Sequence, residues 1–261
     1  MLWNLKNLDE GRVIAKVGST IYGMLVDAGR LIVGENGRAI HLIDLGTKEV
    51  IRSIEIKAPV FAIHRANDRY FVGTGAGELF VFDLSLNYLN KLRPCTKSIR
   101  SIKSFETDLA LGLSDNTIRI FDKETLEQKY EVTGHTLSVF SLVFNSDTQQ
   151  LLSVGRDAQI RVWDVFNHYK EIKSIPAHMY AANDIVLDPS GKWFATGSMD
   201  KTIKIWDTST FALLKVIDKA RHEGHKNSVN KLLWMGIDNL LVTCSDDRSI
   251  AVWDIKNLGD Q

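Results

Sequence analysis

A five-residue pattern of apolar and polar positions recurs along the whole chain: apolar, any residue, apolar, aromatic or Ile, and then Asp. The successive Asp residues are 39, 39, 42, 43 and 47 positions apart. An earlier copy, in MLWNL, has Trp3 followed by Asn4 instead of Asp. The other copies end at Asp44, Asp83, Asp122, Asp164, Asp207 and Asp254. Seven marks at one period indicate an internal repeat.

Between two marks, the chain reads as four short apolar runs separated by turn residues. The repeat that ends at Asp207 shows this order best. β-Branched and aromatic residues fill its runs, and Gly, Asp, Asn or Ser bound them, which is typical of β-strands. We expect strands at residues 183–187, 193–198, 202–207 and 212–217, with turns at 188–191 and 199–201. This order predicts an all-β fold, a β-propeller of four-stranded antiparallel blades.

The period covers the whole chain, so we expect a single domain over residues 1–261. A partial blade, 1–17, with strands at 2–5 and 12–17, precedes six full repeats. These repeats are about 18–57, 58–96, 97–133, 134–176, 177–218 and 219–261. The last repeat has no fourth strand in its sequence pattern. Seven blades of ~41 residues need roughly 290 residues. We therefore interpret the chain as a seven-bladed propeller that lacks the first strands of its N-terminal blade. The alternative is a closed six-bladed ring, with 12–17 as the outer strand of the last blade.

A second regularity joins a His, a hydroxyl residue, an Asp and a Trp in each of the last three repeats. The separations are 18, 4 and 6 residues every time. The His lies in the loop that enters the blade, the hydroxyl on the second strand, the Asp in the tight turn and the Trp on the third strand. The three sets are His135, Ser153, Asp157 and Trp163; His178, Thr196, Asp200 and Trp206; and His225, Thr243, Asp247 and Trp253.

This spacing predicts one buried hydrogen-bond network in each of these blades. The His can donate to the Asp with one ring nitrogen and meet the hydroxyl with the other, and the hydroxyl can accept from the indole. A Ser–His–Asp hydrolase is the rival interpretation. It is disfavoured because the set occurs three times, twice with Thr at the nucleophile position, and no G-x-S-x-G motif is present. The residues therefore predict structural networks and no catalytic residue.

Gly-His pairs at 134–135 and 224–225 and Trp-Asp pairs at 163–164, 206–207 and 253–254 complete the pattern. With them the chain resembles the WD-repeat β-propeller family, and its layout resembles the small stand-alone bacterial members. The resemblance spans the whole chain and is most specific in residues 134–255. It implies a rigid docking platform that is not an enzyme. In this family, binding commonly uses the face formed by the loops that enter the blades.

The N-terminal repeats depart from this pattern. Their Trp positions hold Ile43, Phe82 and Phe121, and the network His is absent. The turn position holds Gly37 and Ala76 in the first two repeats, while the third keeps Asp115 but has Leu111 where a hydroxyl would be. We expect these blades to lack the network and to be held by apolar packing.

Composition narrows the function classes. Lys plus Arg and Asp plus Glu both number 32, so the net charge is zero and a bulk electrostatic grip on nucleic acid is not expected. Two cysteines, Cys95 and Cys244, favour a reducing compartment, and we expect a cytoplasmic protein. We see no secretory signal and no apolar run near the roughly 18 residues that a membrane span needs, so membrane insertion is not expected.

Positions at the rim of the blades are candidates for partner binding. They either open a first strand, follow a network His, or precede a turn Asp. Exposed Met and Tyr side chains suit an adaptable binding surface. The candidates are Ser138, Arg156, Met179, Tyr180, Ala181, Met199, Ser228 and Asp246.

Two other segments carry weaker signals. Gly73, Gly75 and Gly77 suggest a phosphate loop, but no helix pattern follows, so a strand–turn–strand is favoured. The basic loop 218–227 is a solvated insertion or a partner-contact loop, and its His222 and His225 lack a metal-site spacing.

The sequence thus predicts a non-enzymatic scaffold that docks a protein or peptide on the face of the entering loops, without cofactor or metal. One alternative is a propeller-based hydrolase with a metal at the mouth of the channel. The other is a nucleic-acid-associated factor that uses the loop 218–227.

Overall fold

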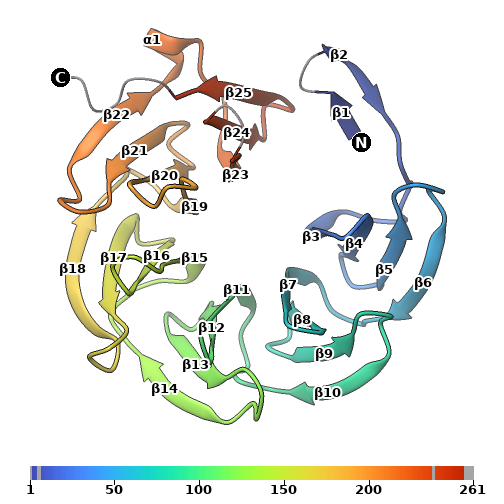
Figure 1. Ribbon diagram of the computed structural model, residues 1–261. Helices are drawn as coiled ribbons and strands as arrows, with labels where there is room; N and C mark the ends of the chain where they lie inside the picture. Colours follow the sequence, from blue (N-terminus) through green and yellow to red (C-terminus); the bar gives the residue numbers. More distant parts are fainter. Residues whose placement is uncertain (1, 5–6, 237–238, 256–261) are drawn as a thin grey trace. The chain divides into compact units, whose positions relative to one another are not determined.

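The computed structural model describes residues 2–4, 7–236 and 239–255. These residues form mostly short β-strands (Figure 1). The chain divides into two compact units, Met1–Ile102 and Lys103–Gln261. Each unit is described by itself.

The first unit holds a two-stranded sheet and two four-stranded blades. The two-stranded sheet pairs β1 (Leu2–Asn4) with β2 (Asn7–Arg12). The first blade has β3 (Ile21–Asp27), β4 (Arg30–Glu35), β5 (Ala39–Asp44) and β6 (Val50–Glu55). The second has β7 (Val60–Ala66), β8 (Arg69–Thr74), β9 (Leu79–Asp83) and β10 (Tyr88–Leu92).

Four further blades follow, and the boundary between the units falls within β11. The third blade has β11 (Ile99–Phe105), β12 (Asp108–Leu113), β13 (Ile118–Asp122) and β14 (Gln128–Val132). The fourth has β15 (Val139–Asn145), β16 (Gln150–Gly155), β17 (Gln159–Asp164) and β18 (Lys170–Pro176). The fifth has β19 (Ala182–Leu187), β20 (Trp193–Ser198), β21 (Ile203–Asp207) and β22 (Leu213–Ile217). After the short helix α1 (Lys219–His222), the sixth blade has β23 (Val229–Trp234), β24 (Leu240–Ser245) and β25 (Ile250–Asp254).

The prediction of an all-β propeller with four-stranded antiparallel blades is confirmed, and the strands expected in the fifth repeat agree within one residue. The prediction of seven blades is wrong, because the described residues form six, as in the alternative. The expected strand at 12–17 is also wrong. Residues 13–17 lie outside the strands, since Ala15 and Val17 instead pack against buried aliphatic side chains of the first blade. Part of the predicted strand 2–5, Leu5, lies outside the described residues.

The second strands of the first five blades are buried along almost their whole length. β4, β8, β12, β16 and β20 share one burial pattern, a half-buried residue followed by five buried ones. The fourth strands are mostly exposed, as in β6 and β10. Burial thus decreases from the second to the fourth strand of a blade. Because the second strands are buried, we look for functional polar residues in the turns at the two ends of the strands.

Apolar side chains of adjacent blades form shared clusters. In the second unit, Trp163 packs with residues of the third blade, and Trp206 packs with residues of the fourth. In the first unit, Phe82, at a Trp position, is buried in the cluster that joins the first and second blades. At these three positions, an indole or a phenyl ring therefore fills the space between two sheets.

Candidate functional site: the entering loops of the fourth to sixth blades

In the fourth blade the structure brings His135, Ser153, Asp157 and Trp163 together. His135 Nδ1 lies 2.9 Å from Asp157 Oδ2, and its Nε2 lies 2.7 Å from Ser153 Oγ. Trp163 Nε1 donates to the same hydroxyl oxygen at 2.9 Å. The network assigns the proton to Nδ1, so that Ser153 donates to Nε2 while accepting from the indole. Ser153 is fully buried, which leaves its hydroxyl no access to a substrate.

The fifth blade repeats the arrangement. His178 lies 2.9 Å from Asp200 Oδ2 through Nδ1 and 2.8 Å from Thr196 Oγ1 through Nε2. Trp206 Nε1 donates to Thr196 Oγ1 at 3.0 Å.

The sixth blade does the same with a partly exposed indole. His225 lies 3.0 Å from Asp247 Oδ2 and 2.7 Å from Thr243 Oγ1, and Trp253 Nε1 donates to Thr243 Oγ1 at 3.0 Å. Each of the fourth, fifth and sixth blades thus holds its own network, and the three histidines do not share one pocket.

The turn Asp of each network also fixes the loop that enters the blade. Asp200 Oδ2 accepts from the backbone N–H of Met179 at 3.1 Å. The N–H groups of Thr136 and Lys226 donate to the turn Asp of their own blades at 3.0 and 2.8 Å. The networks therefore position the backbone of three entering loops, which we define as residues 134–138, 177–181 and 224–228.

A second set of backbone contacts joins each entering loop to the tight turn of its blade. Met199 N donates to Ala181 O at 2.9 Å. The same bond links Arg156 to Ser138 at 2.8 Å and Asp246 to Ser228 at 3.0 Å. Six of the eight predicted partner-binding residues are thus paired, blade by blade, on one face.

The electrostatics of the fifth blade suit a neutral His beside an ionised Asp. Burial alone would raise the pKa of Asp200, but hydrogen bonds from His178 and Thr202 hold that pKa well below its usual value. Burial lowers the pKa of His178, and Asp200 opposes this only in part. The pKa values of Asp157 and Asp247 are also lowered, because hydrogen bonds outweigh their burial.

The predicted partner-binding residues differ in how far they reach solvent. Met179 is 84% exposed, Tyr180 61% and Met199 58%. Arg156 and Asp246 are exposed as well, and Asp246 accepts from Asn230 Nδ2 at 2.6 Å.

Three of the predicted partner-binding residues expose less of their side chains to solvent, and so to a partner. Ser138 and Ala181 are half-buried. Ser228 is buried, and its hydroxyl accepts from Asn183 and donates to Asn230. The side chain of Ser228 therefore points into the blades.

The sequence reasoning missed Leu137, which is 44% exposed on the same face. Leu137 follows the network His by two positions, as Tyr180 does, so the repeat spacing could have found it. It also missed Asp184, a buried carboxylate on β19. Asp184 accepts from Ser141 Oγ at 2.7 Å and from Leu232 N at 2.9 Å and so links the first strands of three blades. No repeat spacing marks this residue.

The first three blades lack the His network, as the sequence predicts, and use other polar contacts. In the first unit, Tyr70 Oη donates to Asp27 Oδ2 at 2.7 Å, and Arg65 pairs with the same carboxylate. Burial and the bond to Asp27 raise the pKa of Tyr70 to about 12. In the third blade the lone turn Asp115 accepts from the side chain of Thr117 at 2.7 Å.

The weaker motifs take structural roles. Gly77 has φ +76°, and a Cβ there would lie 2.2 Å from the Cys95 carbonyl oxygen, so the backbone geometry explains this glycine. In the loop 218–227, Asp218 caps α1 and pairs with Arg221 at 2.6 Å, which neutralises one of the loop's three basic residues, Lys219, Arg221 and Lys226. His225 belongs to the sixth network, and the described residues contain no group of three His, Cys, Asp or Glu that could hold a metal.

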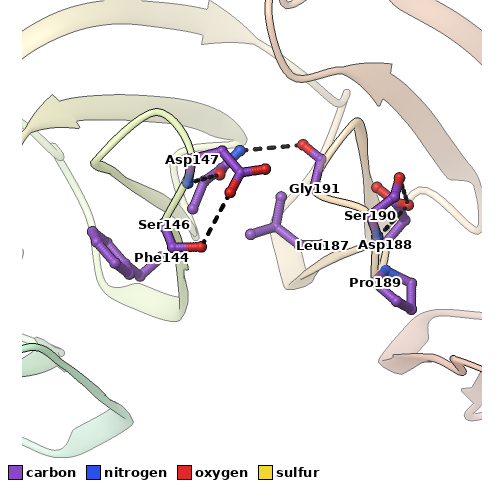
Figure 2. A pocket seen from close by; sticks show the side chains of 9 residues that line it. Phe144, Ser146, Asp147, Leu187, Asp188, Pro189, Ser190 and Gly191 are labelled. Carbon is purple, nitrogen blue, oxygen red and sulfur yellow. Dashed lines mark hydrogen bonds between the residues drawn. The ribbon is translucent and has the colours of Figure 1, made fainter.

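A polar pocket of about 140 Å³ lies at the opposite ends of these strands (Figure 2). Its walls are the β15–β16 and β19–β20 turns. Asn145 Nδ2 donates to Gly191 O at 3.2 Å across it. The Asp188 carboxylate already accepts from Ser190 N and Trp193 N. Local turn contacts therefore use the polar groups of this pocket, unlike the exposed side chains of the entering loops.

Comparison with known families agrees with the repeated networks. A WD40-like domain model matches residues 2–187, and the WD domain, G-beta repeat, matches residues 169–207 and 218–254. The chain belongs to the WD40-repeat family. Propellers of this family generally act as non-enzymatic scaffolds.

Eukaryotic proteins are among the curated relatives of this WD40 chain. The nuclear distribution protein PAC1 of Arthroderma benhamiae is 29% identical over 160 residues, which are 58% of this chain and 34% of the relative. Protein tipD of Dictyostelium discoideum is 24% identical over 261 residues, 97% of this chain and 36% of the relative. The chain thus spans about a third of the length of these relatives.

A solved structure shows the same fold. The crystal structure of the computationally designed Ika8 protein matches with a TM-score of 0.74 and 23% identity over 91% of this chain and 71% of the designed one.

In the part of the chain that the structure describes, no helix is both long and apolar enough to cross a bilayer.

Proposed function

We propose that this WD40 chain is a non-enzymatic scaffold that docks a protein or peptide on the face of its entering loops. The proposal rests on a contrast in the fifth blade between a buried residue that fixes the entering loop and exposed residues next to it. His178 is held in a complete network, while the neighbouring Met179 and Tyr180 are 84% and 61% exposed.

The chemistry of this face suits a partner with apolar side chains. Met is adaptable in shape, and Tyr offers an apolar ring with a polar end, so both are suited to anchoring a bound segment. Leu137 and Met199 extend the apolar surface to the neighbouring turn and loop. Because the net charge is zero, we expect binding to depend weakly on salt, in contrast to nucleic-acid binding.

Affinity purification with quantitative mass spectrometry tests the proposal. Met179→Ala, Tyr180→Ala and Arg156→Ala are compared with the unchanged chain. Leu213→Ala is the matched control, because Leu213 is 45% exposed on the outer strand of the same blade. We expect at least one partner to be lost about tenfold with a face variant and retained with the control. Retention of every partner by all three variants would remove the proposed face.

Three further features stay proposals: the single domain over residues 1–261, the cytoplasmic location and the likeness to small stand-alone bacterial members. Fractionation of the source cell tests the location, since the scaffold and its partner must share one compartment.

A further inference from the structure

The first blade carries an apolar face that is more exposed than the same face of later blades. Met24 stands opposite Val33 in the β3–β4 register, as Leu142, Ile185 and Leu232 stand opposite the matching residues of their own second strands. Met24 is 63% exposed, whereas these three residues are 6%, 2% and 7% exposed. Val26, two residues further along β3, is 61% exposed.

In the later blades, a neighbouring sheet covers this position. Leu142 belongs to a cluster with residues of the third blade, Ile185 to one with the fourth and Leu232 to one with the fifth. In the first blade, the corresponding space is an apolar cavity of about 210 Å³. It is lined by Ile14, Ala15, Val17, Ile21, Met24, Val26, Leu31, Val33, Ile43 and Leu45.

The two-stranded sheet of β1 and β2, which precedes the first blade in the sequence, indicates what would fill the cavity. β1 carries the recurring mark at Trp3–Asn4, which elsewhere lies on the third strand of a blade, and it pairs with β2 as a third strand pairs with a fourth. In the five complete blades, the other edge of the third strand pairs with a second strand. The sheet that the described residues form at β1 has two strands, without a first and a second.

We propose that the first unit accepts a β-hairpin of two short strands from another polypeptide. Its inner strand pairs with the edge of β1, and its apolar side chains cover Met24 and Val26 and fill the cavity. Such a hairpin would bury the apolar face of the first blade. It would also form hydrogen bonds with the backbone N–H and C=O groups at the edge of β1. The hairpins that the structure describes are already built into the chain's own blades, so a folded second copy would cover the face without pairing with the edge. This surface is separate from the entering loops, so the inference is independent of the proposed function.

The chemistry of the hairpin follows from the blades that are complete. Val143, Leu152 and Val154 of the fourth blade are the β15–β16 residues that pack toward the fifth blade. A peptide that copies residues 139–155 therefore presents the required aliphatic side chains and serves as the probe. The control peptide carries Leu152→Lys and Val154→Lys.

Protection of a thiol at Met24 measures docking. Met24→Cys is made with Cys95 and Cys244 replaced by Ala and is labelled with a maleimide. Ile51→Cys is the matched control, because Ile51 is 53% exposed on the outer strand of the same blade. We expect the 139–155 peptide to slow labelling at position 24 about tenfold at saturation, with position 51 unchanged and the control peptide inactive.

Other outcomes overturn the proposal. Equal protection by the two peptides, or of both positions, shows non-specific association. Slow labelling at position 24 in the monomeric chain alone shows that the chain covers this face itself. Slow labelling that appears only with dimerisation, measured by ultracentrifugation, identifies a second copy as the occupant. Protection by dodecanoate but not by the peptide identifies a small apolar ligand instead.

Discussion

The fifth blade and the second blade share one strand order but stabilise their loops by different means. In the fifth, Asp200 joins a buried His to the backbone of the entering loop. In the second, the turn position holds Ala76, and the buried Tyr70 donates to Asp27 of the first blade. The fifth blade thus ties its entering loop to its own turn through a buried His, whereas the second blade has no such His and has a buried Tyr that bonds to the first blade.

The largest expected effect comes from removing the turn carboxylate. Asp200→Ala leaves Met179 N without its acceptor and His178 Nδ1 with only the longer contact to Thr202 Oγ1 at 3.3 Å, and we expect a loss of about 1–3 kcal/mol in the free energy of unfolding. Asp115→Ala is the matched control, since Asp115 has no network His and is expected to cost less. Urea unfolding of both variants measures the difference. Equal losses would contradict the distinction between the two kinds of blade.

A smaller effect is expected in the first unit. Tyr70→Phe removes the bond to Asp27 while keeping the buried ring, and we expect a loss of about 0.5–1.5 kcal/mol. Asp27 keeps Arg65 as a partner, which limits the cost. The control is Tyr88→Phe on β10, where Tyr88 is 61% exposed. Unfolding midpoints that coincide for the two variants would show that the Tyr70 bond contributes nothing.

The smallest effect is a local dependence on pH. Because the folded pKa of His178 lies below its ordinary value of 6.5, the unfolded state binds more protons as the pH falls through 6.5. The stability of the fifth blade therefore declines on the acid side of 6.5. The lowered pKa of Asp200 adds a further loss only below its ordinary value of 3.8.

Amide hydrogen exchange at pH 7 and pH 5 separates the two blades. After correction for intrinsic rates, we expect β20 and β21 to lose protection at pH 5 and β8 and β9 to keep theirs. An equal loss in both pairs of strands would mean that acid acts through the whole chain and not through His178.

The sequence predicted what the repeat itself encodes. The spacing of His178, Thr196, Asp200 and Trp206 placed four side chains that the structure brings together. Their role in stability and the binding role of the exposed face stay predictions.

Contacts that do not follow the period could not be read from the sequence. Asp184 and Asp27 are single residues whose hydrogen-bond partners lie on other blades. No repeated motif in the sequence marks these pairs. The seven-blade prediction failed for a related reason, because counting Trp-Asp marks does not show which strands accompany each mark. Among the described residues, the mark at β1 lies in a sheet of two strands instead of four.

The bond from Met179 N to Asp200 has an evolutionary consequence, since the backbone of residue 179 is held through an atom that every residue except proline possesses. Substitutions at this position can change what the loop recognises without changing where the loop is. Descendants of such a chain are free to acquire new specificities one residue at a time while the scaffold beneath stays intact.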